Sequence, residues 1–502
     1  MDKAKIILDK DFTISKVDEK VFSSFVEPLG RCIYGGIYEP GHATADKNGF
    51  RQDVLELTKP LNVTLNRFPG GNYTSTFRWE DGIGPKELRP RRAEVAWQSI
   101  ETNQFGLNEF ADWSKLNGSD VMMTVNLATR GVLEAMDCVE YCNFKEGTSL
   151  SDLRISHGYK NPHGFRYWCL TNEIDGVWQV GQKTGTDYGR IAREASKGMK
   201  LLDENIKTVL AGSSSPSQDS FPSFDAAALE ESYDFVDYLS IHQYIGNAKN
   251  DSPNYLAKTL ITDKYLKTAI ATCDYIKAKT KSKKKMKISF DEFNTWHSIA
   301  EEERFNNKWQ IAPPLLEDTY TMEDALVLGG MLLAVLKNAD RVEIACVSEL
   351  VNCISHIRTR NGGGAWVLPP YYTFLLFSKY GRGTSLMTQV SSPKYDSTDF
   401  TDVPYLDAAA TLADNGDISI FAINRSMEEA LPLETELRGF ENYAVIEHIV
   451  LKSEGAKDTN TEECPNNVIP QNNGNAQITG NKLVAALPKL SWNVIRLQKI
   501  NK

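Results

Sequence analysis

The sequence contains no long apolar run and no excess of positive charge, and these two absences limit the classes of protein to consider. No stretch approaches the roughly 20 consecutive apolar residues that a helix needs to cross a bilayer. The formal net charge is -10, which disfavours nucleic acid and anionic membranes as partners. One basic run occurs at residues 277–287, between a helix-like and a strand-like pattern, where lysines are typical of a helix C-terminus and a solvated loop.

Cysteine pairs at ligand spacing and a signal peptide are also missing. The eight cysteines are scattered through 502 residues, which favours free thiols. Cys138 and Cys142 could share one helix face, but no cysteine or histidine lies near them at ligand spacing, so we expect no zinc site. The N-terminal residues show neither an apolar h-region nor a small-residue cleavage site. We therefore expect a cytoplasmic protein.

What the sequence does contain is a regular alternation of strand-like and helix-like segments over its first three quarters. Helix-like patterns include residues 99–116, 187–202, 263–279 and 321–338. Such an alternation, with eight strands, predicts an α/β fold with a (β/α)8 barrel. The strand-like segments are residues 21–27, 63–68, 120–127, 165–170, 208–213, 238–244, 286–290 and 342–347.

The pattern changes after about residue 380, where helical periodicity ends. Residues 406–413 and 417–424 flank Asp414-Asn415-Gly416, a strong hairpin signal. Further strands are expected at residues 443–451, 475–478, 482–486 and 492–497, which indicates an antiparallel, jelly-roll-like β-sandwich. The N-terminal strand, residues 3–9, needs an antiparallel partner that this sandwich could supply. We expect residues 1–16 to pack with the sandwich, residues 17–380 to form the barrel and residues 381–502 to form the sandwich.

Two glutamates, Glu173 and Glu292, follow the fourth and the seventh of these strands. A glutamate after a strand is more often a neighbour of a helix cap or a solvated loop residue. The dyad Asn172-Glu173 and a second acid three strands later nevertheless favour a joint site, because catalytic groups of a barrel stand at the carboxyl ends of its strands. Two carboxylates at one mouth can cleave a glycosidic bond: one protonates the leaving oxygen while the other attacks or activates water.

Other strand ends carry polar and aromatic residues of the kind that sugar sites use for hydroxyls and C–H faces. The pair Gly70-Gly71 predicts a tight turn where a side chain would block the sugar ring. Structural interpretations remain open, because Arg67 could pair with a barrel carboxylate and Tyr244 could cap the barrel. A histidine such as His242 is more often a satisfied neighbour than a catalyst. The candidates are Glu27, Arg67, Asn72, His242, Tyr244 and Trp296.

Several of these segments resemble glycoside hydrolase family 51, and the similarity covers nearly the whole chain. The family consists mainly of α-L-arabinofuranosidases, retaining enzymes with a (β/α)8 barrel and a β-sandwich that are often hexameric and intracellular in bacteria. The resemblance therefore implies a homo-oligomer that removes terminal α-L-arabinofuranosyl residues from oligo- or polysaccharides, with no metal or organic cofactor. The matching segments include Arg67-Phe68-Pro69-Gly70-Gly71-Asn72, Thr171-Asn172-Glu173-Ile174-Asp175-Gly176 and Phe290-Asp291-Glu292-Phe293-Asn294.

The resemblance also assigns roles: Glu173 is the acid/base and Glu292 the nucleophile. A retaining site needs carboxyl groups ~5–5.5 Å apart, one protonated and one ionised. We expect burial and the neighbouring carboxylate to raise the pKa of Glu173, and Arg67 and Tyr244 to keep Glu292 ionised. By resemblance, the furanose in the -1 subsite is bound by Glu27, Arg67, Asn72, Asn172 and Tyr244, and Trp97 and Trp296 lie near the entrance.

The chain departs from the family pattern at Thr171, where glycine is common, and after the eighth strand. There, Gly364-Ala365-Trp366-Val367-Leu368 replaces Gly-Ala-Trp-Arg-Gln, which predicts a lost hydrogen bond to the sugar unless another loop supplies it. His356 stands where proline is usual. Three alternatives stay open: a retaining glycosidase of this fold for β-D-galactofuranosides, xylosides or β-glucans; a non-catalytic carbohydrate-binding protein; and a metal-dependent barrel hydrolase, for which a convincing His/Asp ligand set is lacking.

Overall fold

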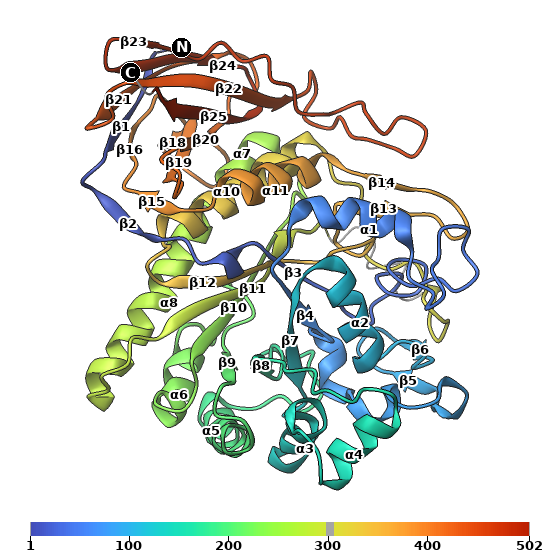
Figure 1. Cartoon of the computed structure of the whole chain (residues 1–502). Coiled ribbons are helices and arrows are strands. Elements are labelled where there is room, and N and C mark those ends of the chain that lie inside the picture. The colour runs from blue at the N-terminus through green and yellow to red at the C-terminus, as the bar shows by residue number, and fades with distance from the viewer. Residues whose placement is uncertain (1, 298–305, 501–502) are drawn as a thin grey trace.

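The chain forms a closed barrel of eight parallel strands, with helices outside it and antiparallel sheets stacked on one side (Figure 1). The computed structural model describes residues 2–297 and 306–500. All eight predicted barrel strands are present, so the prediction of a (β/α)8 barrel is confirmed. In the order in which they neighbour one another, the strands are β3 (Ser23–Phe25), β4 (Leu65–Phe68), β7 (Asp120–Val125), β8 (Tyr167–Leu170), β9 (Lys207–Ala211), β10 (Tyr238–Ile245), β11 (Lys287–Thr295) and β12 (Val342–Val347).

The helices cover the outside of the barrel, and one predicted helix begins later than expected. The prediction of a helix over residues 99–116 was wrong at its start, because Ser99–Glu101 form β6, paired with β5 (Arg92–Glu94). The helix α2 begins at Leu107, where the Glu109 side chain accepts a hydrogen bond from the backbone of Gly106 and so caps the first turn. The α-helices within residues 2–297 and 306–500 are α1 (Gln52–Thr58), α2 (Leu107–Asn117), α3 (Val132–Asn143), α4 (Ser149–Ser156), α5 (Gly185–Leu202), α6 (Ser223–Ser232), α7 (Ser252–Ala257), α8 (Thr259–Thr280), α10 (Met322–Lys337) and α11 (Pro369–Tyr380).

A small apolar cluster occupies the interior of the barrel. It takes side chains from most of the barrel strands, as the layered packing of such barrels requires. Cys169 and Cys346 belong to it as small core residues, and all eight cysteines are free thiols. The cluster leaves the carboxyl ends of the strands available for polar groups. Its members are Phe25, Leu65, Met122, Cys169, Val209, Tyr238, Ile344 and Cys346.

Two sheets of five and six strands form the C-terminal part and confirm the predicted sandwich. Strands β19 (Leu406–Leu412) and β20 (Ile418–Asn424) pair across the predicted hairpin. Strand β1 (Ala4–Asp9) joins the five-stranded sheet, antiparallel to β16 (Gln389–Ser391) as expected but parallel to β21 (Leu431–Arg438), a strand that the sequence analysis missed. The other strands of these two sheets are β2 (Thr13–Lys16), β15 (Thr384–Leu386), β22 (Tyr443–Lys452), β23 (Gln477–Thr479), β24 (Lys482–Leu487) and β25 (Ser491–Lys499).

The barrel and the sheets share one continuous core through α10, which lies between them (Figure 1). Strand β20 is buried on both faces. Ile418 and Ile420 face the five-stranded sheet, whereas Phe421 and Ile423 join the larger cluster that includes α10. The sheets are therefore fixed to the barrel by side chains rather than tethered by a loop.

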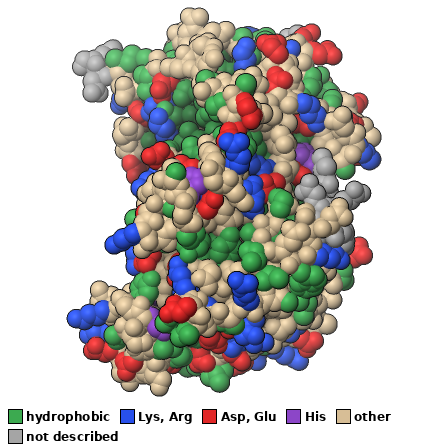
Figure 2. Space-filling view, turned by 90° about the vertical axis from the view of Figure 1, so that its right-hand side faces the viewer, with side chains coloured by type: hydrophobic (Ala, Val, Ile, Leu, Met, Phe, Trp, Pro, Cys, Tyr) green, Lys and Arg blue, Asp and Glu red, His purple; other side chains and the backbone are tan. Residues whose placement is uncertain are grey.

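Among the residues that the structure describes, no helix is both long and apolar enough to cross a bilayer. Figure 2 shows acidic and basic side chains intermixed over one face of the molecule.

Candidate active site

A cavity of about 610 Å³ opens at the carboxyl ends of the barrel strands. Its walls come from the segments after several strands, which is where the sequence analysis expected a site. Arg67, Asn172 and His242 lie buried in direct contact with lining residues. The structure thus brings all the predicted site residues together. Those that line the cavity are Glu27, Asn72, Trp97, Glu173, Tyr244, Glu292 and Trp296.

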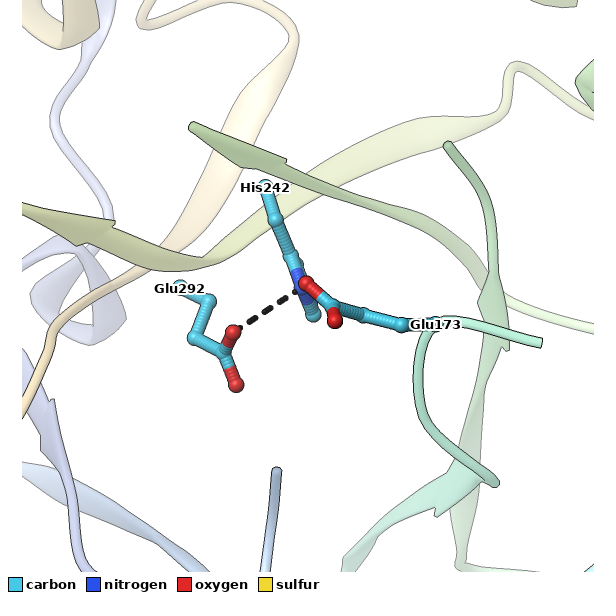
Figure 3. Close-up of side chains that lie close together, drawn as sticks. All are labelled: Glu173, His242 and Glu292. Carbon is cyan, nitrogen blue, oxygen red and sulfur yellow. Dashed lines mark hydrogen bonds and ion pairs between the residues drawn. The ribbon is translucent and has the colours of Figure 1, made fainter. Parts of the chain in front are cut away.

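Glu173 and Glu292 converge on one nitrogen of His242 (Figure 3). His242 Nδ1 lies 2.9 Å from Glu173 Oε1 and 3.1 Å from Glu292 Oε2. One oxygen of each glutamate and one ring nitrogen of His242 lie within 4.8 Å of one another. Carboxyl oxygens this close are consistent with a retaining pair, whose carboxyl groups lie roughly 5–5.5 Å apart.

Irregular backbone makes this convergence possible. The pairing of β10 with β11 shifts register between Ser240 and His242, and that of β11 with β12 shifts between Phe290 and Phe293. On a regular strand, Asp291 and Glu292 would face opposite sides of the sheet. The shift lets both enter one network, in which the hydroxyl of Ser240 donates to Asp291 Oδ1 at 2.5 Å.

Arg67 connects the proposed nucleophile with the amides of the site. Its Nη1 donates to Glu292 Oε1 at 2.9 Å and its Nη2 to Asn172 Oδ1 at 2.5 Å. Asn172 in turn donates to Asn72 Oδ1 at 3.2 Å. The guanidinium group is buried and therefore interacts strongly with the carboxylate. Tyr244, the other expected donor, lines the cavity with its ring edge-on to Trp296.

The two glutamates have pKa values shifted in opposite directions. Burial, and then the charge of Glu292, raise the pKa of Glu173. Burial works to raise the pKa of Glu292 as well, but His242 and Arg67 outweigh it and lower that pKa. Against the effect of its own burial, the surrounding carboxylates raise the pKa of His242 well above its usual range. The surroundings thus favour the protonated form of Glu173 and the ionised form of Glu292.

Glu27 and the glycine pair fit together in a way that the sequence analysis did not foresee. Glu27 Oε1 accepts hydrogen bonds from the backbone of Tyr73 and from the indole of Trp97, each at 2.8 Å. A Cβ atom at Gly71 would lie 2.0 Å from Glu27 Oε2, and one at Gly70 would lie 1.8 Å from the ring of Phe25. The glycines are therefore needed for the approach of Glu27 and Phe25, not only for room around a sugar.

Trp178 is a site residue that the sequence analysis missed. Its indole donates to Glu173 Oε2 at 3.0 Å, and its ring is 48% exposed beside the cavity. A tryptophan five residues after the strand-end glutamate was the available signal, but the direction of its ring depends on the loop, which packs the ring against Gly176.

Glu349 is the second missed residue, and it changes the expectation for the loop after the eighth strand. Leu368 is buried in the core next to α11 and does not line the cavity, whereas Glu349, two residues beyond β12, does. A polar group from that loop is therefore present after all. Burial, and then Glu27, raise the pKa of Glu349 well above its usual range. His356 is a buried residue whose Nε2 lies 2.9 Å from Asn294 Oδ1.

Glu173, His242 and Glu292 are also close enough to present three ligand atoms to a metal ion. His242 nevertheless directs Nδ1 at two carboxylate oxygens, as a donor N–H does, and its pKa is raised well above its usual range. The contacts therefore fit a histidine that orients the two carboxylates by hydrogen bonds.

Two family models match the chain, and they cover most of it. Residues 57–267 match a model described as α-L-arabinofuranosidase 1 domain. The matched residues include β4 and end within α8. Residues 291–491 match one described as α-L-arabinofuranosidase C-terminal domain. Glu173 falls within the first match and Glu292 within the second.

Curated relatives and a solved structure agree with these matches over the full length. An intracellular exo-α-(1→5)-L-arabinofuranosidase of Halalkalibacterium halodurans is 51% identical over 497 residues, covering 99% of each chain. The corresponding enzyme 1 of Bacillus subtilis is 49% identical over 500 residues, covering 99% of this chain and 100% of that one. The structure of a family 51 α-L-arabinofuranosidase from Bifidobacterium longum superposes with a TM-score of 0.94 at 35% identity, covering 99% of this chain and 100% of that one.

Proposed function

Because the chain belongs to the α-L-arabinofuranosidases of glycoside hydrolase family 51, we propose that it hydrolyses terminal α-L-arabinofuranosyl residues with retention of configuration. One observation carries the mechanism: two buried glutamates of opposite pKa shift meet at a single histidine nitrogen at the mouth of the barrel. This is the arrangement that a double displacement needs, with one proton donor and one nucleophile.

In the first step, an Oε atom of Glu292 attacks the anomeric carbon while the glycosidic C–O bond breaks. The proton of Glu173 goes to the departing oxygen, which leaves as an alcohol. Arg67 and His242 support this step because they keep the Glu292 carboxylate ionised and oriented. The product is a covalent furanosyl ester on Glu292.

In the second step, water replaces the leaving group. Glu173, now a carboxylate, takes a proton from the water whose oxygen attacks the anomeric carbon, and the ester bond to Glu292 breaks. Asn172 is placed by Arg67 and Asn72 beside both glutamates and is our candidate for the sugar 2-hydroxyl contact. Glu27, Asn72, Tyr244, Trp97 and Trp296 complete the proposed sugar contacts.

The natural bond is proposed to be α-(1→5), cleaved from the chain end, because both curated relatives named above are exo-acting on that linkage. Their names also describe them as intracellular, and we infer the same location for this protein. The homo-oligomer implied by family resemblance, a hexamer, remains a proposal that light scattering coupled to size-exclusion chromatography tests.

The decisive experiment compares an aryl α-L-arabinofuranoside with an aryl β-D-galactofuranoside, each with the unmodified enzyme and with Glu292→Ala. Hydrolysis of the arabinofuranoside by the unmodified enzyme, abolished in the variant, is the expected result. Proton NMR of the first-formed sugar should show retained anomeric configuration. Preference for the galactofuranoside, or inversion, would contradict the proposal.

A further inference from the structure

The N-terminus of α10 connects the C-terminal sheets with one wall of the active-site cavity. The backbone N–H groups of Met322 and Glu323 donate to Asp458 O and Ala456 O, each at 3.0 Å. The first N–H groups of a helix have no partner within the helix. Here the long connection between β22 and β23 supplies two of these partners, so the loop from the sheets is fixed to the start of α10.

The side chain of Glu323 extends this connection toward the cavity. The carboxylate is buried and accepts hydrogen bonds from Asn247 Nδ2 at 2.9 Å and from Ser252 Oγ at 2.5 Å. It also forms an ion pair with Lys457 of the same β22–β23 connection. One buried carboxylate therefore holds the segment after β10 and a lysine from the C-terminal sheets together.

Asn247 lies in the wall of the cavity, between the lining residues Gly246 and Ala248. Its backbone N–H donates to His297 Nδ1 at 3.2 Å, and His297 lines the same cavity. His297 Nε2 lies 2.9 Å from Asp324 Oδ1, in the same first turn of α10. The wall is therefore held to the start of α10 at two neighbouring acidic side chains, Glu323 and Asp324.

We propose that Lys457 is a positioning residue for substrate binding: through Glu323 it fixes Asn247 and thereby the Gly246–Ala248 wall of the cavity. The expected effect of Lys457 on substrate binding rests on the proposed function. Its effect on the position of Asn247 does not. Without the ammonium group, the buried Glu323 carboxylate would lose the lysine that pairs with it, and its side chain would move toward water. Such a movement weakens the acceptor that holds Asn247.

The wall lies beside the cavity rather than at the reacting bond, so the expected effect is on the binding of substrate. We expect Lys457→Met to raise KM for an α-(1→5)-arabino-oligosaccharide about 10-fold, because small misplacements of a binding wall reduce productive binding. The kcat on an aryl arabinofuranoside should change less than about twofold. Lys457→Arg should restore the KM, because it supplies a cation at the same position.

Lys482→Met provides a matched control. Lys482 pairs with Glu434 at 2.9 Å and its side chain is 50% exposed, against 51% for Lys457. The two acidic partners differ: the Glu323 side chain is 1% exposed, whereas that of Glu434, in β21, is 15% exposed, pairs also with Lys3 and does not line the cavity. The control substitution should leave KM and kcat unchanged. Thermal unfolding of all variants shows whether any change merely follows lost stability.

Hydrogen exchange measured by mass spectrometry gives a readout that does not depend on activity. The backbone N–H groups of Asn247 and Asp251 are bonded to His297 Nδ1 and Asn247 Oδ1, so they should exchange at least about 10-fold faster in Lys457→Met and at the unmodified rate in Lys482→Met. Unchanged exchange and unchanged KM in Lys457→Met would overturn the inference, as would an equal change in the control. An unmodified enzyme that cleaves no arabinofuranoside would instead overturn the proposed function, while the exchange result still decides the role of Lys457.

Discussion

Pairing among β19, β20 and β25 continues without a register shift, whereas β10 and β11 at the barrel mouth both shift register. The sheet strands alternate their side chains between two apolar cores. At the mouth, Thr171 and Glu173 adopt φ values of 82° and 41°, a region that is strained for residues with a Cβ atom. Regular pairing maximises apolar burial, while the irregular backbone places charged groups together that a regular strand would separate. Substitutions in the two regions should therefore act on different properties.

The largest effect is expected from Glu292→Ala, which removes the proposed nucleophile. Its kcat should fall by at least about 10⁴-fold, since loss of a covalent nucleophile leaves only binding and orientation. The midpoint of thermal unfolding should also fall, because His242 and Arg67 lower the pKa of Glu292 and thus stabilise its carboxylate in the fold, and both lose that partner in the variant. Substantial residual turnover in steady-state assays would show that another group attacks the sugar.

Glu173→Ala should have a smaller effect that depends on the leaving group. Poor leaving groups need the proton and should lose about 10²–10⁴-fold in kcat/KM, whereas activated aryl glycosides should keep much of the first step. Azide should rescue turnover and give an arabinosyl azide, because the vacated space admits a small anion. Comparing a series of aryl leaving groups measures this dependence. Equal loss on all of them would contradict the acid/base assignment.

The opposite pKa shifts predict a bell-shaped pH profile of kcat/KM. Glu292 has a lowered pKa and must be ionised, so activity is lost as the pH falls through that value. Glu173 has a raised pKa and must be protonated, so activity is lost as the pH rises through that value. Each limb should decline about tenfold per pH unit. With an activated aryl substrate, the alkaline limb should disappear in Glu173→Ala.

Glu27→Gln tests how the buried carboxyl group of Glu27 affects the pH dependence of the free energy of unfolding. Burial raises the pKa of Glu27 to about 8. When folding raises the pKa of a carboxyl group, its contribution to the free energy of unfolding is greatest below the pKa of the unfolded state. That contribution is lost as the pH rises from there through the folded-state pKa, here about 8. The glutamine variant should therefore lose less free energy of unfolding between pH 5 and 8 than the unmodified protein, by more than about 1 kcal/mol. Urea titrations across that range measure the difference, and parallel curves would contradict it.

The smallest effect is expected in the regular region, from Ile420→Val. Ile420 is fully buried between the two sheets, so loss of one methyl group should reduce the free energy of unfolding by about 1 kcal/mol. The kcat should stay within about twofold of the unmodified enzyme. A larger change in kcat would show that packing between the two sheets acts on the reacting groups.

The contrast between the regular sheets and the irregular barrel mouth also explains which features could be predicted from the sequence. Barrel strands and the hairpin around Gly416 were predictable because apolar runs and turn residues are local signals. The ends of two such strands also indicated Glu173 and Glu292. The position of His242 between them was not predictable, because it depends on a register shift after Ser240 that no local pattern marks.

Two features of the structure that the sequence analysis missed, the pairing of β1 with β21 and the site residue Glu349, have separate physical reasons. The parallel pairing of β1 with β21 joins residues more than 400 positions apart, and a pattern of short range carries no information on it. Glu349 follows the eighth strand much as Glu173 follows the fourth. The position alone did not indicate a site residue, because the local sequence Ser348-Glu349-Leu350 has no feature that separates it from a solvated loop.

The place of β1 in the five-stranded sheet has a consequence for synthesis on the ribosome. Both ends of the chain lie at the sheets (Figure 1), and β1 lies between β16 and β21. Strand β1 therefore cannot pair with either neighbour until the barrel has been translated and residues 389–391 and 431–438 have followed it. During that interval its exposed edges are open to wrong partners, and a chaperone that shields the nascent N-terminal segment should improve the yield of correctly folded protein.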